Sequence, residues 1–171
     1  MKTIVVAVSF ALLFNTALCA QIKTTPHVHA GEHVIFSFKA IKSGKYVTIL
    51  ESSSGDILYR YGKPGKVELQ FPQDPVSGKA CFTFRWYMRP DVGDTNEGLD
   101  EFTLWFEHHG YRYEIAYSYY YPKKEMSVHL SVHDPKGRQI LFLEGDTATV
   151  VGSLSLLKDD ERVIQKPWYD E

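Results

Sequence analysis

The chain has 171 residues, of which 44% are hydrophobic, 23% are charged and 14% are aromatic, and its formal net charge is −2. This composition excludes a disordered tail, a collagen-like repeat and a basic nucleic-acid-binding arm. The length fits one compact domain of about 100–200 residues. Eleven Tyr, ten Phe and three Trp residues favour β-sheets over a helical bundle.

The first 20 residues have the layout of a secretory signal peptide. Met1 and Lys2 form a short positive start, Thr3–Leu18 is almost entirely apolar or small, and Ala20 provides a small residue for cleavage. We expect cleavage after Ala20 and a periplasmic or secreted mature chain. The alternatives are an uncleaved anchor, although the apolar stretch is shorter than the ~20 residues of a bilayer span, and a lipid-modified Cys19.

Cleavage would leave Cys81 as the one cysteine of the mature chain, with 18 basic against 21 acidic residues once Lys2 is removed. We therefore expect no internal disulfide, so a packed core must hold the fold. No later apolar stretch approaches the length of a membrane span, so the mature form is not expected to be embedded in a membrane. The weak acidity also argues against nucleic acid as a partner.

After the signal we expect a polar N-terminal arm over 21–33, a β domain over 34–157 and a polar C-terminal tail over 158–171. Short apolar runs alternate with turn-forming residues through the β domain, and no segment has the 3.6-residue period of a long helix. The fold class predicted is a single antiparallel β-sandwich or flattened barrel of about eight to ten strands. The candidate strands are Val34–Ala40, Lys45–Glu51, Ile57–Tyr61, Val67–Phe71, Cys81–Met88, Asp100–His108, Tyr111–Tyr121, Met126–His133, Gln139–Leu143 and Val150–Leu157.

The segment from Cys81 to Tyr121 has the clearest period-two pattern, with one apolar and one polar face on each strand. A two-residue turn at His109-Gly110 would pair His108 with Tyr111, since Gly and His both tolerate positive φ. That register places Leu104 and Phe106 inside and pairs Glu107 with Arg112 on the wet face.

Aromatic residues also occur on the face predicted to be wet, where Tyr87, Trp105 and Tyr120 accompany Arg85 and Arg112. Such residues anchor partner proteins, because they bury a large area at a low cost in conformational entropy. The same rings could stack on sugars. For a sandwich, however, we favour the interpretation that a second sheet covers this face and that the rings are ordinary core residues.

A long loop rich in acidic residues, Gly and Asn follows this region, and Arg89, Asp91, Asp94 and Asn96 are candidates for contact with a partner. Its oxygen atoms could bind Ca²⁺, but their spacing fits no Ca²⁺-loop pattern, so a solvated turn is the alternative.

Three histidines, His27, His29 and His33, are weak candidates for a surface Zn²⁺ or Cu²⁺ site. We favour adventitious binding by a flexible arm over a selected metal site. We therefore predict no metal site and no cofactor.

Enzymatic motifs are missing from the sequence, including the nucleophile elbow, the zinc-protease helix motif and the phosphate-binding glycine loop. Cys81 could pair with a distant His as a nucleophile, but it fits a small core residue as well. We expect a protein that is not an enzyme.

Three motifs carry a resemblance: YRYGKPGKVELQFP at Tyr59–Pro72, NEGLDEFTLWF at Asn96–Phe106 and GYRYEIAYSYY at Gly110–Tyr120. Over about 45–157 the chain resembles a loose group of uncharacterised small secreted or periplasmic bacterial β-rich proteins. Many of these carry extra cysteines in the front half, which this chain lacks. In size, export and strand content it is also similar, at the level of class, to periplasmic lysozyme inhibitors and immunity proteins.

The function predicted from these features is a non-enzymatic periplasmic or secreted binding protein, an inhibitor or immunity factor against a cell-wall hydrolase or toxin. The alternatives are a glycan-binding module of the cell envelope and a His-based metal-handling protein. The sequence leaves open the identity of the partner and the oligomeric state.

Overall fold

The structure, a computed structural model, describes residues 25–74, 80–90 and 97–168. The expected signal peptide and three candidate loop residues, Asp91, Asp94 and Asn96, lie outside the described residues. Within the described ranges the protein is all-β, as the sequence predicts. No helix in these ranges has the length and hydropathy needed to span a membrane.

Ten strands form one sheet in the order β10-β5-β6-β7-β8-β9-β1-β2-β3-β4. The prediction of a purely antiparallel sheet is wrong, because β10 runs parallel to β5 and makes the sheet mixed. The elements are β1 (His33–Ala40), β2 (Tyr46–Glu51), β3 (Ile57–Lys63), β4 (Lys66–Phe71), β5 (Thr83–Arg89), β6 (Leu99–His108), β7 (Tyr111–Tyr120), η1 (Tyr121–Lys123), β8 (Glu125–His133), β9 (Gln139–Gly152), η2 (Leu154–Leu157) and β10 (Ile164–Lys166).

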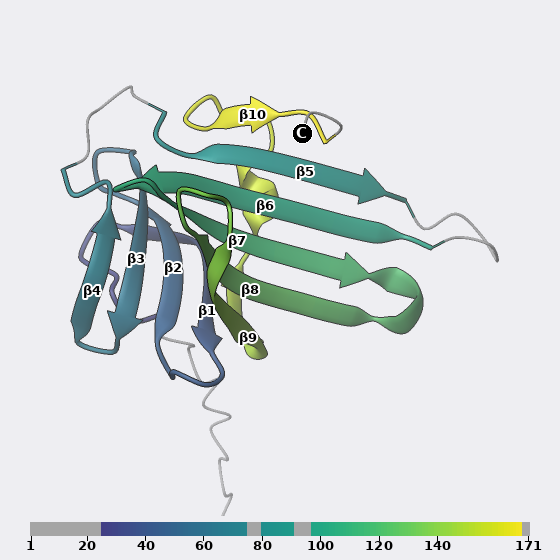
Figure 1. The fold of residues 1–171 in the computed structure, drawn as a ribbon, viewed down its shortest axis with the longest axis horizontal. Helices are drawn as coiled ribbons and strands as arrows, with labels where there is room; N and C mark the ends of the chain where they lie inside the picture. The colour runs from purple at the N-terminus through teal and green to yellow at the C-terminus, as the bar shows by residue number, and fades with distance from the viewer. Residues whose placement is uncertain (1–24, 75–79, 91–96, 169–171) are drawn as a thin grey trace, which may run out of the picture.

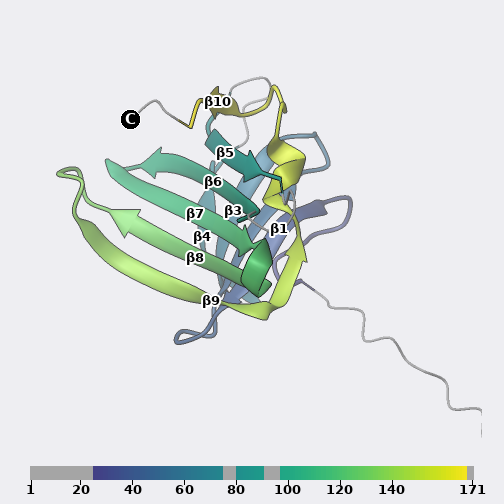
Figure 2. The same ribbon diagram turned by 90° about the vertical axis from the view of Figure 1, so that its right-hand side faces the viewer.

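The sheet curls into a half-barrel, so that β1–β4 lie across from β5–β8 (Figures 1 and 2). The long strand β9 joins the two halves: its first part pairs with β8 as far as Glu144, and its second part pairs with β1 from Gly145 onward. Gly145 is required there, because a Cβ would stand 2.4 Å from the ring of Phe38. The prediction of two strands, Gln139–Leu143 and Val150–Leu157, is therefore wrong: β9 is continuous, and the 3₁₀ helix η2 follows it.

The core lies between the two halves and is dominated by aromatic rings from both. Phe106 of β6 stacks on Tyr113 of β7 and on Phe71 of β4, with ring centroids 5.0 and 4.3 Å apart. Tyr59 of β3 approaches the same Phe106 ring at 4.9 Å. Aromatic pairs of this geometry add about 0.5–1.5 kcal/mol each beyond the area that they bury, so the core also holds the two halves together.

The predicted hairpin of β6 and β7 is confirmed. His108 pairs with Tyr111, and the register continues through Glu107 and Arg112 along both strands. Both turn residues have positive φ, 53° at His109 and 78° at Gly110, as a type I′ turn requires.

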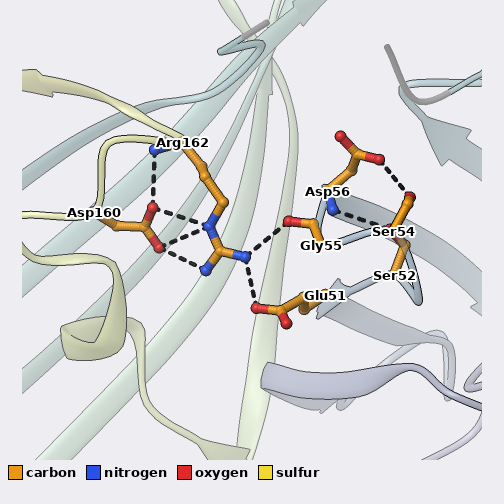
Figure 3. A network of polar contacts seen from close by, with 7 residues as sticks. All are labelled: Glu51, Ser52, Ser54, Gly55, Asp56, Asp160 and Arg162. Carbon is orange, nitrogen blue, oxygen red and sulfur yellow. Dashed lines mark hydrogen bonds and ion pairs between the residues drawn. The ribbon is translucent and has the colours of Figure 1, made fainter. Parts of the chain in front are cut away.

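The segment expected to be a polar C-terminal tail instead contains β10 and is tied to the other half of the sheet. Arg162 donates to Asp160 at 2.7 Å, to Glu51 of β2 at 2.6 Å and to the carbonyl oxygen of Gly55 at 2.8 Å (Figure 3). Hydrogen bonding from Arg162 lowers the pKa of the Asp160 carboxyl group. This network fixes the chain shortly before β10 begins.

The described part of the N-terminal arm is held by a buried ion pair. Arg60 of β3 donates from both terminal nitrogens to the carboxylate of Glu32, at 2.5 and 2.7 Å, and also to the carbonyl oxygen of His27. Burial raises the pKa of Glu32, but hydrogen bonds from Arg60 and from the backbone N–H of His29 outweigh it and hold this pKa below its usual value. Residues 27–32 are therefore part of the folded domain.

Candidate functional site: a groove of stacked tryptophan and arginine

The outer face of β5–β7, which points away from β1–β4, carries the candidate site. Period-two alternation turns Phe84, Leu104 and Ile115 inward, where each is fully buried. Trp105 turns outward and is half-buried. The interpretation in which a second sheet covers this face is wrong for the described residues, since β1–β4 pack on the inner face.

On this face four side chains form a Trp–Arg row, defined as Trp168, Arg85, Trp105 and Arg112. The guanidinium carbon of Arg85 lies 4.8 Å from the ring centroid of Trp168 and 5.9 Å from that of Trp105. Arg112 lies 4.5 Å from the ring of Trp105. Each contact falls within the ~6 Å range of cation–π attraction.

Strand register explains the alternation in the row. Arg85 pairs with Thr103 and Arg112 pairs with Glu107, and these partners stand two residues before and two residues after Trp105 on β6. The two guanidinium groups therefore reach Trp105 from opposite sides along the strand. Two guanidinium groups therefore lie over this half-buried indole ring.

An open groove of about 840 Å³ runs beside three members of the row, Arg85, Trp105 and Arg112, and reaches the hairpin tip between β8 and β9. Charged residues of both signs surround it. The residues lining it are Arg85, Trp105, Glu107, Gly110, Arg112, Glu114, His133, Asp134, Pro135, Gly137 and Lys166.

The charges in the groove are unevenly paired. Arg112 forms an ion pair with Glu114 at 3.1 Å, and Asp134 holds Arg138 at 2.6 Å. Arg85 and Lys166 are cross-strand neighbours on β5 and β10, and neither has a carboxylate partner among the described residues. Like charges placed opposite each other destabilise a sheet, so this end of the groove has a net positive charge that folding alone does not require.

The groove also contains buried polar atoms that no hydrogen bond satisfies within the described ranges. They are Nε of Arg85, Nε of Arg112 and Nδ1 of His133. A buried donor without a partner costs about 1–3 kcal/mol. The row is thus held mainly by stacking, with some loss of stability.

The carboxyl group of Asp134 and the imidazole of His129 have shifted pKa values. Hydrogen bonds from the backbone and side chain of Arg138 and from the backbone of Lys136 lower the pKa of Asp134, which stays ionised and fixes the tip of the β8–β9 hairpin. Burial lowers the pKa of His129, against a smaller opposing effect of Glu114, and therefore favours the neutral imidazole.

The structure separates the residues that the sequence proposed as one site. Tyr87 joins Trp105 near the row, since its ring lies 5.4 Å from that of Trp168. Arg89 and Tyr120 lie at the other end of the strands, where both are paired with Leu99. There Arg89 donates to the carbonyl oxygen of Glu97.

Sequence reasoning missed Trp168 and Lys166, because both lie in the segment expected to be a tail. The signal that was available is an isolated tryptophan within a polar stretch, preceded by the apolar pair Val163 and Ile164. Val163 is buried against the core, and it therefore anchors the segment that carries Trp168.

The three histidines considered for metal binding do not form a centre. The Nε2–H of His27 donates to the carbonyl oxygen of Lys63, 2.6 Å away. In the described ranges, no three His, Cys, Asp or Glu side chains gather in a way that could hold a metal ion.

Comparison with known proteins adds no assignment: no protein-family model, no curated protein and no solved structure matched the chain. The resemblance to small exported β-rich proteins therefore stays a prediction from the hairpin motifs. The function has to be argued from the groove itself.

Proposed function

We propose that this is a non-enzymatic, exported binding protein, acting as an inhibitor or immunity factor that docks on another protein through the Trp–Arg row. The observation that carries the proposal is the stacking of Arg85 and Arg112 on Trp105 in an open groove. Trp, Tyr and Arg dominate the binding energy of protein interfaces, particularly when packed and partly desolvated.

Preorganisation favours binding by this row. Arg85 stands between two indole rings and Arg112 is fixed by Trp105 and Glu114. Their side chains have therefore lost much of their rotamer freedom before a partner arrives, which lowers the entropic cost of association.

The continuous β9, shared by both halves of the sheet, leads us to regard the scaffold as one flattened, half-open barrel.

The partner is expected to place a carboxylate at the end of the groove where Arg85 and Lys166 lie. Charge-assisted hydrogen bonds from two cations to one carboxylate are about twice as strong as neutral ones. Glu107 and Glu114 give the other end of the groove acidic character. The groove would therefore favour a partner whose charges have the opposite signs and occur in the matching order along the groove.

A glycan is the less favoured ligand, for a geometric reason. Sugars stack on an open face of an aromatic ring, whereas two guanidinium groups already lie over the ring of Trp105. Glycan binding at this groove is therefore kept as an outcome of the test.

The test compares three immobilised forms of the protein, the wild type, Arg85→Ala and the control Val67→Ala on β4, in envelope extract from cells that produce it. We expect one protein to be retained in stoichiometric amount by the wild type and the control, and lost with Arg85→Ala. Calorimetry with that purified protein should then show the same difference. If no protein binds in stoichiometric amount, or a cell-wall glycan binds instead, the proposal is wrong.

A further inference from the structure

A second, smaller cavity lies on the outer face of β6, β7 and β8, and we call it the β6–β8 hollow. Its volume is about 220 Å³, below the roughly 300–1,000 Å³ of sites for drug-sized ligands, so it is the size for a single side chain. Small residues form its floor: Thr103 of β6 pairs with Ala116 of β7, and beside them the hydroxyl groups of Ser118 and Ser127 are hydrogen-bonded at 2.9 Å.

Thr103 is the residue of this floor that points to a ligand. Its side chain belongs to the outer face of β6 and lines the hollow, yet the residue is only 7% exposed. Within the described ranges its hydroxyl group has no hydrogen-bond partner. A buried hydroxyl group without a partner costs stability, and a donor that entered the hollow would satisfy this oxygen.

Glu101 gives the hollow a negative charge that the fold leaves uncompensated. It stands two residues before Thr103, on the same face of β6, and forms no ion pair with any described residue. Arg85 pairs with Thr103 in the strand register, but its guanidinium group is stacked between Trp168 and Trp105 and does not pair with Glu101.

The other ionisable groups of the hollow do not supply the missing positive charge. Glu114 also lines the hollow, and its ion pair with Arg112 balances its own charge only. Burial lowers the pKa of His129 and favours the neutral imidazole. The hollow as a whole therefore attracts a cation.

Trp168 adds an apolar wall beside the carboxylate. Its ring lies 5.4 Å from that of Tyr87, whose cross-strand neighbour is Glu101, and the residue is 37% exposed. An alkyl chain can pack along such a ring while its charged end reaches a polar group. The hollow thus combines an aromatic wall, an anion and a hydroxyl oxygen.

We infer that the β6–β8 hollow binds the side chain of a lysine on the partner protein. The ammonium group donates to the carboxylate of Glu101 and to the hydroxyl oxygen of Thr103, and the methylene groups pack on Trp168. Lysine carries three donors at the tip of a slender stem, which suits this narrow site better than the broad, planar fork of arginine.

The inference deepens the proposed function and rests on it for the source of the lysine. The partner would present a carboxylate to Arg85 and Lys166 and a lysine to the hollow next to them. Because the two sites carry opposite charges, they would also set the orientation of the partner on the sheet.

A titration of the ¹⁵N-labelled full chain with n-butylammonium chloride tests the hollow without the partner, against sodium chloride at the same ionic strength. The amide signals of Glu101 and Thr103 and the indole N–H signal of Trp168 are expected to shift and to saturate. n-Butanol, which has a similar shape without the charge, should cause no saturable shift. No saturable shift with n-butylammonium, or an equal response to n-butanol, would overturn the inference.

Two variants identify the groups that bind the ammonium ion. Glu101→Gln should weaken n-butylammonium binding about tenfold, because it removes a charge-assisted hydrogen bond. Thr103→Val should weaken it about threefold, because it removes the acceptor and retains a side chain of similar shape. The same spectra show whether each variant is folded.

The matched control is Glu125→Gln, which makes the same change of charge at an exposed residue of β8 that does not line the hollow. It should bind n-butylammonium as the wild type does. Wild-type affinity in either hollow variant, or an equal loss in Glu125→Gln, would contradict the assignment.

The protein retained by the wild type then tests the source of the ammonium group. Glu101→Gln should bind that protein about tenfold more weakly in calorimetry, and full affinity would show that no lysine of the partner enters the hollow. Trp105→Ala should lose the partner and still bind n-butylammonium, because Trp105 lines the groove and not the hollow. A retained protein without n-butylammonium binding would refute the hollow alone, whereas n-butylammonium binding without a retained protein would refute the proposed function and the lysine as the source.

Discussion

The inner and outer faces of β6 use the same kinds of side chain for different purposes. Inside, Phe102, Leu104 and Phe106 are almost fully buried and pack against apolar neighbours. Outside, Trp105 is half-buried and packs against two arginines. The inner face gains stability from burial, whereas the outer face leaves charged donors unpaired beside an open groove. Aromatic content alone therefore does not identify the core of this protein. The residues that surround each ring show whether the ring belongs to the core or to the surface.

The largest effect is expected inside. Phe106→Ala should lower the free energy of unfolding by about 3–5 kcal/mol, because it removes a ring that contacts Phe71, Tyr59 and Tyr113 and leaves a cavity. Urea unfolding measures the change. Glu107→Ala, its exposed neighbour, should change stability by less than about 0.5 kcal/mol; similar losses for both would contradict the assignment of the faces.

The next effect concerns the buried ion pair that attaches the N-terminal arm. Glu32→Gln should destabilise the fold by about 3 kcal/mol, since it leaves the Arg60 guanidinium buried without a counter-charge. Chemical unfolding at pH 7 measures this, with Glu68→Gln in the exposed pair with Lys45 as the control.

The same pair predicts a dependence on pH. The pKa of Glu32 is lower in the folded protein than its ordinary value of 4.5, so the unfolded chain binds the proton more tightly. The stabilisation is complete above pH 4.5 and is lost as pH falls through the lower, folded value. Wild type and Glu32→Gln should therefore converge in stability on acidification, and parallel profiles would show that Glu32 is not paired.

A smaller effect is expected where the C-terminal segment meets β2. Arg162→Ala should cost about 1 kcal/mol, because the Arg162 network is partly exposed to solvent. Its clearer signature is release of β10, which would detach Trp168 from Arg85 and shift the tryptophan emission to longer wavelength. Unchanged emission would show that buried Val163 and the pairing of β10 with β5 hold the segment without the Arg162 network.

The sequence predicts the fold best where local pattern and tertiary burial agree. Alternation from Cys81 to Tyr121 and the His109-Gly110 turn determine the β6–β7 register residue by residue. The prediction fails at β9, because the polar run Glu144–Thr149 looks like a loop in the sequence. In the structure this run is part of a strand that passes from one half of the sheet to the other around Gly145. Such a bend depends on the packing of Phe38, which no local pattern contains.

The site is predictable in part for the same reason. Strand parity places Arg85, Trp105 and Arg112 on one outer face. Trp168 and Lys166 reach that face through β10, a three-residue parallel strand whose position depends on the Arg162 network and on buried Val163. Contacts between residues so distant in the chain leave no periodic signal in the sequence.

The most direct test of the account measures stability and partner affinity together for Leu104→Ala and Trp105→Ala, adjacent residues on opposite faces. Leu104→Ala should lower the free energy of unfolding by about 3 kcal/mol and leave the affinity of the folded protein unchanged. Trp105→Ala should cost less than about 2 kcal/mol and abolish binding. Full affinity in Trp105→Ala would contradict the claim that the Trp–Arg row is the binding site.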